Sequence, residues 1–336
     1  MSGDKDIITL ADGGGGIKTM SLLEELLLPS VGSKDDSLED GAFLKDLRLV
    51  FTTDSFTVSP IFFPGGDIGR LSVFGTANDL AVMGASPDYL SVSFIIEEGF
   101  LRKDLERIAR SIGRASEEAG IKVVCGDTKV VPRGAVDGIY INTSGIGRLV
   151  SNEPLIAERA MKGDAIVVSG DIGRHEAVVL IARGDFGLES ELESDLAPVY
   201  KGVKALVDSD VGFVFARDLT RGGLAMALFE LALKSKTRVI VDEKRIPINI
   251  SVVGLCEILG LEPAFLACEG TFISVVKNGK KAVKVLRDTG FPEASLIGFL
   301  GEGESIKDIE RVVLKTKIGS HRLLPLPTGE LTPRIC

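Results

Sequence analysis

Apolar and polar residues alternate along the first half of the chain with two different periods, which predicts a mixture of strands and helices. Tyr89–Ile96 is rich in β-branched residues that alternate as in a half-buried strand, and we expect it to form a sheet edge. Ile68–Gly84 has apolar residues at helical spacing, and Leu101–Ala119 predicts an amphipathic helix that ends at Gly120. Further strands are predicted at Leu47–Thr53, Val123–Cys125 and Gly138–Arg148.

The pattern changes near residue 150, where we place a domain boundary. In the second half predicted strands and helices follow one another, which is typical of mixed α/β layers. From His321 onwards the chain has three prolines and no periodicity, which predicts a mobile tail. The expected units are residues 1–150, residues 151–320 and a tail of residues 321–336. Predicted strands are Ala165–Ser169, Val211–Ala216, Arg238–Val241 and Thr271–Val276, and predicted helices are Gly222–Lys234 and Gly279–Thr289.

Composition narrows the functional classes. The 336 residues carry a net charge of −9 and no basic block, which argues against a nucleic-acid-binding protein. The chain has no apolar run long enough to cross a bilayer and begins with polar, acidic residues, so we expect a cytoplasmic protein without a membrane partner. Four cysteines without a CxxC pair, and only two histidines, argue against a structural zinc site.

The positions of five aspartates are the most unusual feature of the chain. Asp54 ends a predicted strand, Asp127 and Asp218 each follow one, Asp79 lies inside an apolar helix, and Asp40 precedes a glycine. Each aspartate alone is more typical of a turn or a helix cap. Together, carboxylates that converge on a cleft would repel one another unless cations hold them, and oxygen ligands suit Mg²⁺ with a nucleotide phosphate.

Two glycine segments could approach an anion through their backbone N–H groups. Asp12–Gly16 follows a short apolar run but matches no phosphate-binding pattern, so a flexible linker is an equally good interpretation. Arg221 and Gly222 open a predicted helix, where a tight turn is the alternative. His175 precedes a helix and is interpreted as a first-turn residue, with an active-site role left open.

Cys336 is the last residue of the sequence and follows Pro333, Arg334 and Ile335. A prenylation box needs three residues after its cysteine, and none is present. A thiol at the tip of a proline-bearing tail can move between partners, whereas an incidental exposed thiol would be a chemical liability. We therefore expect Cys336 to be functional.

Taken together, these segments resemble the HypE family of hydrogenase maturation factors, within the PurM-like superfamily of aminoimidazole-ribonucleotide synthetase. The internal motifs are shared by the superfamily, and the terminal cysteine motif singles out HypE. One departure is the N-terminal loop, which is usually His-Gly-Ser-Gly-Gly in the family and lacks the imidazole and the hydroxyl here. The resemblance rests on residues 40–42, 52–56, 75–85, 126–131, 142–147, 218–224 and 333–336.

The resemblance implies a two-domain α+β fold whose N-terminal domain pairs with a second copy into a dimeric β-barrel, with ATP and Mg²⁺ in a cleft beside it. It implies that the carbamoyltransferase HypF loads a carbamoyl group onto Cys336, that this enzyme dehydrates it to a thiocyanate, and that the cyanide passes to iron on a HypC–HypD scaffold. The implied catalytic residues are Cys336, Lys129 and Glu269. The implied metal ligands are Asp40, Asp54, Asp79, Asp127 and Asp218, and the implied nucleotide site adds Asn78, Thr128, Asn142, Arg221 and Gly222.

Two competing hypotheses remain at this point. Another ATP-using enzyme of the superfamily is one, but a thiamine-monophosphate kinase would not need Cys336, and a selenophosphate synthetase would want a reactive cysteine within residues 11–16, which contain none. A non-enzymatic nucleotide sensor or scaffold that binds a partner through its tail is the other. ATP turnover that requires a carbamoylated tail would argue against both.

Overall fold

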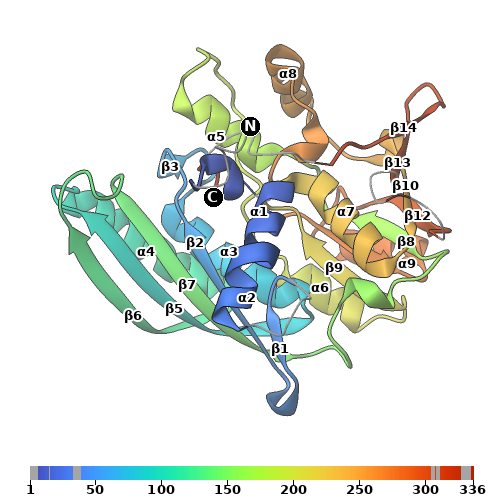
Figure 1. Ribbon diagram of the computed structural model, residues 1–336, viewed down its shortest axis with the longest axis horizontal. Coiled ribbons are helices and arrows are strands. Elements are labelled where there is room, and N and C mark those ends of the chain that lie inside the picture. The colour runs from blue at the N-terminus through green and yellow to red at the C-terminus, as the bar shows by residue number, and fades with distance from the viewer. Residues whose placement is uncertain (1–6, 15, 33–38, 304–306, 308–310, 327–333) are drawn as a thin grey trace.

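The computed structural model describes residues 7–14, 16–32, 39–303, 307, 311–326 and 334–336. Two large β-sheets, one from each half of the chain, are joined by helices that lie between and around them (Figure 1). Gly15 of the glycine loop and Pro333 of the predicted tail motif lie outside the described residues. Within the described part, no helix combines the length and the apolar character that crossing a bilayer requires.

The first sheet has five strands in the order β1-β2-β7-β5-β6. All neighbours are antiparallel except β5 and β6, which are parallel because the crossover helix α4 connects them. The prediction that Tyr89–Ile96 is an edge was wrong, because β5 is an inner strand and β6 forms the edge. The strands are β1 (Ala42–Leu44), β2 (Leu49–Phe56), β5 (Ala85–Glu97), β6 (Lys122–Val131) and β7 (Ile139–Leu149).

Two helices cover one face of this sheet. Helix α4 (Arg102–Ala119) buries one stripe and ends at Gly120, whose φ of 71° gives the left-handed cap that the sequence predicted. Helix α3 (Ile68–Val82) is buried all round, because it packs on β2, β5 and β7 on one side and on elements of the second sheet on the other. Gly75 of α3 is needed at its position, since a Cβ there would lie 2.7 Å from the ring of Phe56.

The second sheet has seven strands in the order β14-β13-β10-β12-β8-β11-β9, antiparallel except for the β10–β13 pair. Its strands are β8 (Ala165–Val168), β9 (Phe213–Asp218), β10 (Arg238–Asp242), β11 (Phe272–Val276), β12 (Ser295–Gly301), β13 (Val312–Lys315) and β14 (His321–Leu323). Its helices are α5 (Arg174–Arg183), α6 (Tyr200–Val207), α7 (Gly223–Ser235), α8 (Ile250–Leu259) and α9 (Gly279–Asp288).

The beginning of the chain forms a helical segment that runs past α3 and α7 (Figure 1). It comprises α1 (Ile17–Leu22), a π-helical turn (Leu23–Leu27) and α2 (Leu28–Val31), which ends at Gly32 with φ 69°. Short elements complete the fold: the hairpin β3 (Phe62–Phe63) and β4 (Gly66–Asp67), and single 3-10 turns at Leu10–Asp12, Lys45–Leu47, Ala157–Arg159, Glu243–Arg245 and Pro263–Phe265.

The expectation of an irregular tail from His321 was wrong for its first residues. Strand β14 pairs with β13, where Leu323 lies opposite Val313. Residues 334–336 are also seated on the protein, and Ile335 belongs to the apolar cluster of the first domain with only 5% of its surface exposed. The sequence gives few signals of these contacts because β14 has only three residues.

Candidate active site

Three aspartates from distant parts of the sequence meet between the two sheets. Asp40 precedes β1, Asp79 lies on α3, and Asp218 is the last residue of β9. Each offers a carboxylate oxygen, and these atoms all lie within 4.8 Å of one another. The hydroxyl oxygen of Thr52 lies 2.9 Å from a carboxylate oxygen of Asp79 and 2.7 Å from the backbone oxygen of Asp40, both within hydrogen-bond distance, which ties β2 to the cluster.

Burial and mutual repulsion disfavour the charged form of these carboxylates. Burial raises the pKa of Asp218 to about 6, opposed by the charge of Arg217 and reinforced by that of Asp54. The pKa of Asp79 is well above its ordinary value because of burial and then of Asp218 and Asp40. A cation among the three would relieve this repulsion, so the group has the properties of a metal site for a hard cation.

Basic residues surround the acids on the second-domain side. Arg217 on β9 pairs with Asp40 at 3.1 Å and with Glu230 of α7 at 3.0 Å, and Lys234 pairs with Glu39 at 2.8 Å. These residues and the three aspartates line a cavity of about 750 Å³, to whose wall α1 contributes Thr19 and Met20. This volume is within the range of small-molecule sites. Arg217 was not predicted as a site residue, although it directly precedes Asp218 on the same strand.

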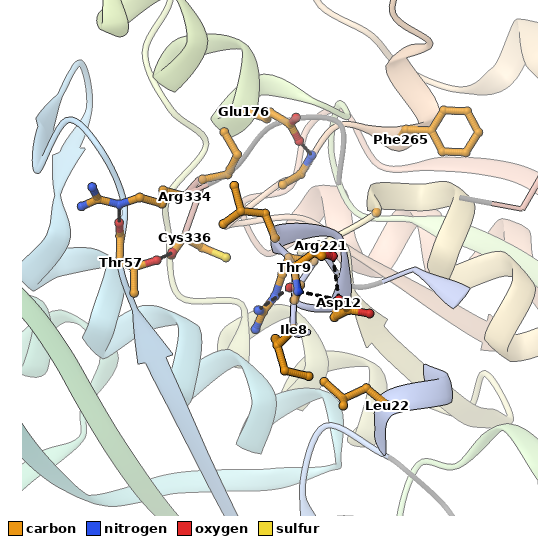
Figure 2. A pocket seen from close by; sticks show the side chains of 16 residues that line it. Ile8, Thr9, Asp12, Leu22, Thr57, Glu176, Arg221, Phe265, Arg334 and Cys336 are labelled. Carbon is orange, nitrogen blue, oxygen red and sulfur yellow. Dashed lines mark hydrogen bonds between the residues drawn. The ribbon is translucent and has the colours of Figure 1, made fainter. Parts of the chain in front are cut away.

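Arg221 connects this acidic cavity with a second one. It lies in the turn between β9 and α7, and its guanidinium is 3.8 Å from Asp54 of β2 and donates to the backbone oxygen of Gly13 at 3.4 Å. The second cavity has a volume of about 530 Å³ and is lined by the N-terminal loop, Arg221, Gly222 and residues 334–336 (Figure 2). The glycine loop, predicted as a candidate anion cradle, therefore lies beside Arg221.

Glycines shape the turn that carries Arg221. Gly222 has φ 77° and is the cap of α7, and Gly223 has φ 56°. A Cβ at Gly223 would lie 2.5 Å from the backbone oxygen of Leu266, so the turn can pack there only as glycine. This close packing aims the first turn of α7 and the Arg221 side chain at the cavities.

Cys336 lies on the wall of the second cavity, with its sulfur directed into it (Figure 2). The backbone N–H of Thr57, just beyond β2, donates to the Cys336 oxygen at 3.0 Å. Burial raises the pKa of the thiol to about 12, although the nearby charge of Arg221 lowers it. The thiol is therefore protonated at neutral pH in this seat.

Glu269 precedes β11 and is 3% exposed. Among the described residues neither of its carboxylate oxygens has a hydrogen-bond partner. Burial and the charges of Asp218 and Asp195 raise its pKa well above the ordinary value, and Arg221 opposes them. A buried carboxylate without a hydrogen-bond partner lowers the stability of the folded protein, and such groups are typical of functional sites.

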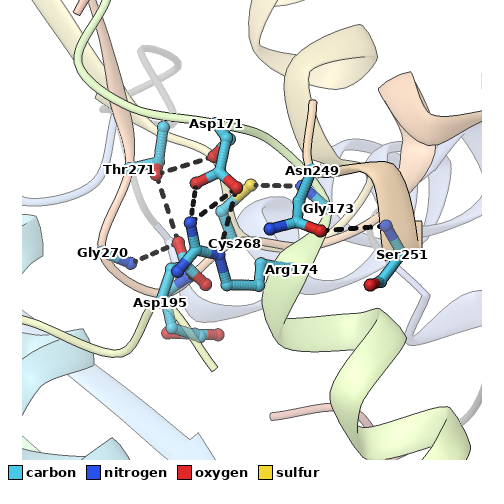
Figure 3. A network of polar contacts seen from close by, with 10 residues as sticks. Asp171, Gly173, Arg174, Asp195, Asn249, Ser251, Cys268, Gly270 and Thr271 are labelled. Carbon is cyan, nitrogen blue, oxygen red and sulfur yellow. Dashed lines mark hydrogen bonds and ion pairs between the residues drawn. The ribbon is translucent and has the colours of Figure 1, made fainter. Parts of the chain in front are cut away.

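The backbone of Glu269 is held by a polar network (Figure 3). The Asp195 carboxylate accepts from the backbone N–H groups of Glu269 at 3.2 Å and Gly270 at 3.0 Å, and from the Thr271 hydroxyl at 3.2 Å. Beside it, Asp171 forms a bidentate ion pair with Arg174 at the start of α5 (Figure 3). The loop is therefore fixed while the Glu269 carboxylate remains without a partner.

Two predicted nucleotide-binding asparagines lie near the acids in different roles. Asn142 on β7 donates to the Asp54 backbone oxygen at 2.8 Å. Asn78 on α3 donates to the backbone oxygens of Ala197 and Glu269, at 3.1 and 3.2 Å, and accepts from Val199 at 2.9 Å. Its polar atoms thus join the first domain to the loop of Glu269.

Six predicted site residues line neither cavity: Asn78, Asn142 and Glu269 lie beside residues that do, and the other three lie on the edge of the first sheet. Asp127, Thr128 and Lys129 lie on the exposed edge strand β6, where Lys129 pairs with Asp127 at 2.8 Å. Asp54 and Asp127 were predicted at strand ends, and both lie inside their strands, because β2 extends to Phe56 and β6 to Val131. Residues 126–131 continue the strand because they pair with β5.

Two family models match the chain. Residues 38–149 match the N-terminal domain of AIR synthase related proteins, and residues 161–309 match the C-terminal domain. The chain is 41% identical over 334 residues to the carbamoyl dehydratase HypE of Rhodobacter capsulatus, with 98% of each covered. It is 37% identical over 340 residues to that of Escherichia coli, covering 98% of this chain and 99% of the other.

Solved structures agree with these relatives. The fold is similar to that of a HypE in complex with ATP, at 40% identity and a TM-score of 0.81, covering 98% of this chain and all of that one. It is similar to the HypE in a HypE–HypF complex, at 37% identity and a TM-score of 0.85, covering 91% of this chain and 100% of the other. Thiamine monophosphate kinase of Aquifex aeolicus, at 19% identity, shares the fold. The chain therefore belongs to the AIR synthase related family and, within it, to the carbamoyl dehydratases of the HypE type.

Proposed function

We propose that this protein is an ATP-dependent carbamoyl dehydratase that converts an S-carbamoyl group on Cys336 into a thiocyanate, and so supplies cyanide for the iron centre of a [NiFe]-hydrogenase. The observation that carries the proposal is the placement of Arg221. Its side chain lines both the cavity with the acid cluster and the cavity with Cys336, so a phosphoryl group held on one side can meet a group carried on the other.

The residues present fit a magnesium–nucleotide complex. Buried carboxylates that raise one another's pKa offer hard oxygen ligands and need a cation. We assign Asp40, Asp79 and Asp218 as ligands, with Asp54 beside them near Arg221. The metal would supply charge neutralisation for the transferring phosphoryl group. ATP would supply the phosphoryl group that turns the carbamoyl oxygen into phosphate, a good leaving group.

The chain must also remove two protons from the carbamoyl nitrogen and stabilise the negative charge that develops on the oxygen. Arg221 is the cation on the path between the cavities and is suited to the second task. Glu269 is suited to the first, since its carboxylate has no partner among the described residues. A bound cation at the acid cluster would weaken the repulsion that raises the Glu269 pKa, which favours the ionised form that accepts a proton.

A second copy of the chain completes this proposal. All but the last of the ten residues of β6 are exposed, and its valines are 45%, 59% and 67% exposed at positions 123, 124 and 130. A long, partly apolar edge strand of this kind is usually covered. We infer that a second subunit pairs along this strand in a homodimer. Asp127, Thr128 and Lys129 lie outside both cavities of their own chain, so their predicted roles would be exercised in the site of the partner subunit.

Two other proteins take part in the proposed sequence. A structure of a related HypE in complex with HypF supports a carbamoyltransferase of that type as the partner that loads Cys336. A HypC–HypD type scaffold is proposed to receive the cyanide. We propose that the protein acts in the cytoplasm, the location expected from its sequence.

Mass spectrometry of the peptide that contains Cys336 tests the proposed function. After incubation with the carbamoyltransferase and its substrates, we expect the mass of a carbamoyl adduct, and after addition of ATP and Mg²⁺ we expect loss of one water. Asp185→Asn, in an exposed turn, is the control for Asp79→Asn, which should block the second change alone. A carbamoyl adduct that persists in the wild-type protein with ATP and Mg²⁺ would refute the proposal.

A further inference from the structure

His175 contacts the segment that carries Cys336, although nothing in the proposed chemistry uses it. The ring lies at the start of α5, is 0% exposed, and packs edge-on against Phe63 at 5.2 Å. Its Nε2 lies 3.0 Å from the backbone oxygen of Ile335, and its Nδ1 lies 2.8 Å from the Ser194 hydroxyl. A carbonyl oxygen can only accept, so Nε2 carries the proton and Nδ1 accepts from Ser194.

Other groups hold the same segment from the opposite side. The backbone N–H of Ser59 donates to the Arg334 oxygen at 3.1 Å, and that of Thr57 donates to the Cys336 oxygen, so residues 334–336 lie against the chain after β2 like a short added strand. Arg183, at the end of α5, donates to the oxygens of Ser59 and Arg334, both at 2.9 Å. We call Thr57, Ser59, His175 and Arg183 the tail seat.

The seat holds the segment in a conformation that it would not keep by itself. Arg334 has φ 56°, the left-handed region that a residue with a Cβ seldom occupies. Its guanidinium donates to the Thr57 oxygen at 2.7 Å and pairs with Asp137. Strained backbone of this kind persists only where surrounding contacts determine it. The contacts therefore set the place of Cys336.

We propose that His175 and Arg183 are positioning residues that set how much of the time Cys336 is seated beside Arg221 and how much of the time it is released. This inference rests on the proposed function and concerns how Cys336 divides its time between the loading step and the dehydration step. Loading by a second protein requires the thiol to be released, since in its seat Cys336 is only partly exposed and its sulfur faces a cavity of the same chain. Dehydration requires the loaded sulfur to be seated next to the acid cavity. A weaker seat should therefore favour the first step and hinder the second.

The first test needs no substrate. Cys336 of the metal-free protein is alkylated with iodoacetamide, and the extent at this residue is followed by peptide mass spectrometry. His175→Leu removes the hydrogen bond to Ile335 and should raise the rate roughly tenfold, the effect of one buried hydrogen bond. His175→Gln keeps an N–H donor near the Nε2 position and should restore most of the protection. His321→Leu, which removes the exposed histidine of β14, is the matched control and should leave the rate unchanged.

The second test uses the loaded enzyme. His175→Leu and Arg183→Met should accept the carbamoyl group at least as fast as wild type and should dehydrate it more slowly. Their ATP affinity should be unchanged. His175→Gln should restore the rate of dehydration. Unchanged ATP affinity also shows that the variants are folded. If His175→Leu does not fold, Arg183→Met still tests the inference. Wild-type rates of alkylation and dehydration in both variants would overturn the inference. If alkylation changes as expected but wild-type protein makes no thiocyanate, the seat stands and the proposed function fails.

Discussion

Removing one charge from the acid cluster should stabilise the metal-free protein while weakening its hold on magnesium. Asp218 has a pKa of about 6 in the folded protein against an ordinary value of 3.8. At about 1.4 kcal/mol per pKa unit, keeping it ionised costs the fold up to about 3 kcal/mol at pH 8. Asp218→Asn removes this cost, so its free energy of unfolding should exceed that of wild type by up to about 3 kcal/mol.

The sign of the pH dependence follows from the raised pKa. The folded state binds the proton of Asp218 more tightly than the unfolded state. The contribution of this group to stability is therefore fully present below pH 3.8 and is lost as the pH rises through 6. The difference between variant and wild type should therefore be largest at pH 8 and shrink as the pH falls through this window.

Urea unfolding in chelator at several pH values measures this difference, and Asp185→Asn in an exposed turn is the control. With magnesium and ATP the order should reverse, because ligand binding stabilises wild type and not the variant. A variant no more stable than wild type at pH 8 in chelator, or one stabilised equally by magnesium and ATP, would contradict the electrostatic account.

Three further predictions follow from the site. Val124→Asp, in the exposed edge β6, should change the sedimentation coefficient from that of a dimer to that of a monomer. Ile250→Asp, on the exposed face of α8, is the control and should leave it unchanged. A monomeric wild-type protein would contradict this prediction. Lys129→Ala and Glu269→Gln should accept carbamoyl but form thiocyanate at least tenfold more slowly, and wild-type rates in a single-turnover assay would exclude both from catalysis. Cys336→Ser should keep magnesium-dependent ATP binding by calorimetry and form no thiocyanate; thiocyanate from this variant would place the carrier elsewhere.

The sequence predicted the elements that have a clear period or a cap. Helix α4 was found from its amphipathic stripe and from Gly120, and both are confirmed. Strand β6 was predicted with only three residues, because Gly126 and Asp127 are typical of turns. Pairing with β5 along the whole segment outweighs that local preference, which no single-chain pattern reveals.

The site was predictable where a residue type contradicted its surroundings. Asp79 inside an apolar helix gave such a signal, and the structure places it in the acid cluster. Arg217 gave none, since a basic residue on a strand is ordinary until its carboxylate partners are known. His175 does lie in the first turn of a helix, α5, as interpreted, but its contact with Ile335 joins positions 160 apart in the sequence and gave no local signal. Long-range pairs of this kind come from the fold and not from local pattern.

The seat of Cys336 also has a consequence for oxidation. Peroxides react with the thiolate and not with the thiol. Because burial raises the pKa of the seated thiol to about 12, very little of it is ionised at pH 7. The seat should therefore protect the sulfur from oxidation, and we expect an oxidant to compete with the proposed carbamoyl donor mainly while the segment is away from its seat.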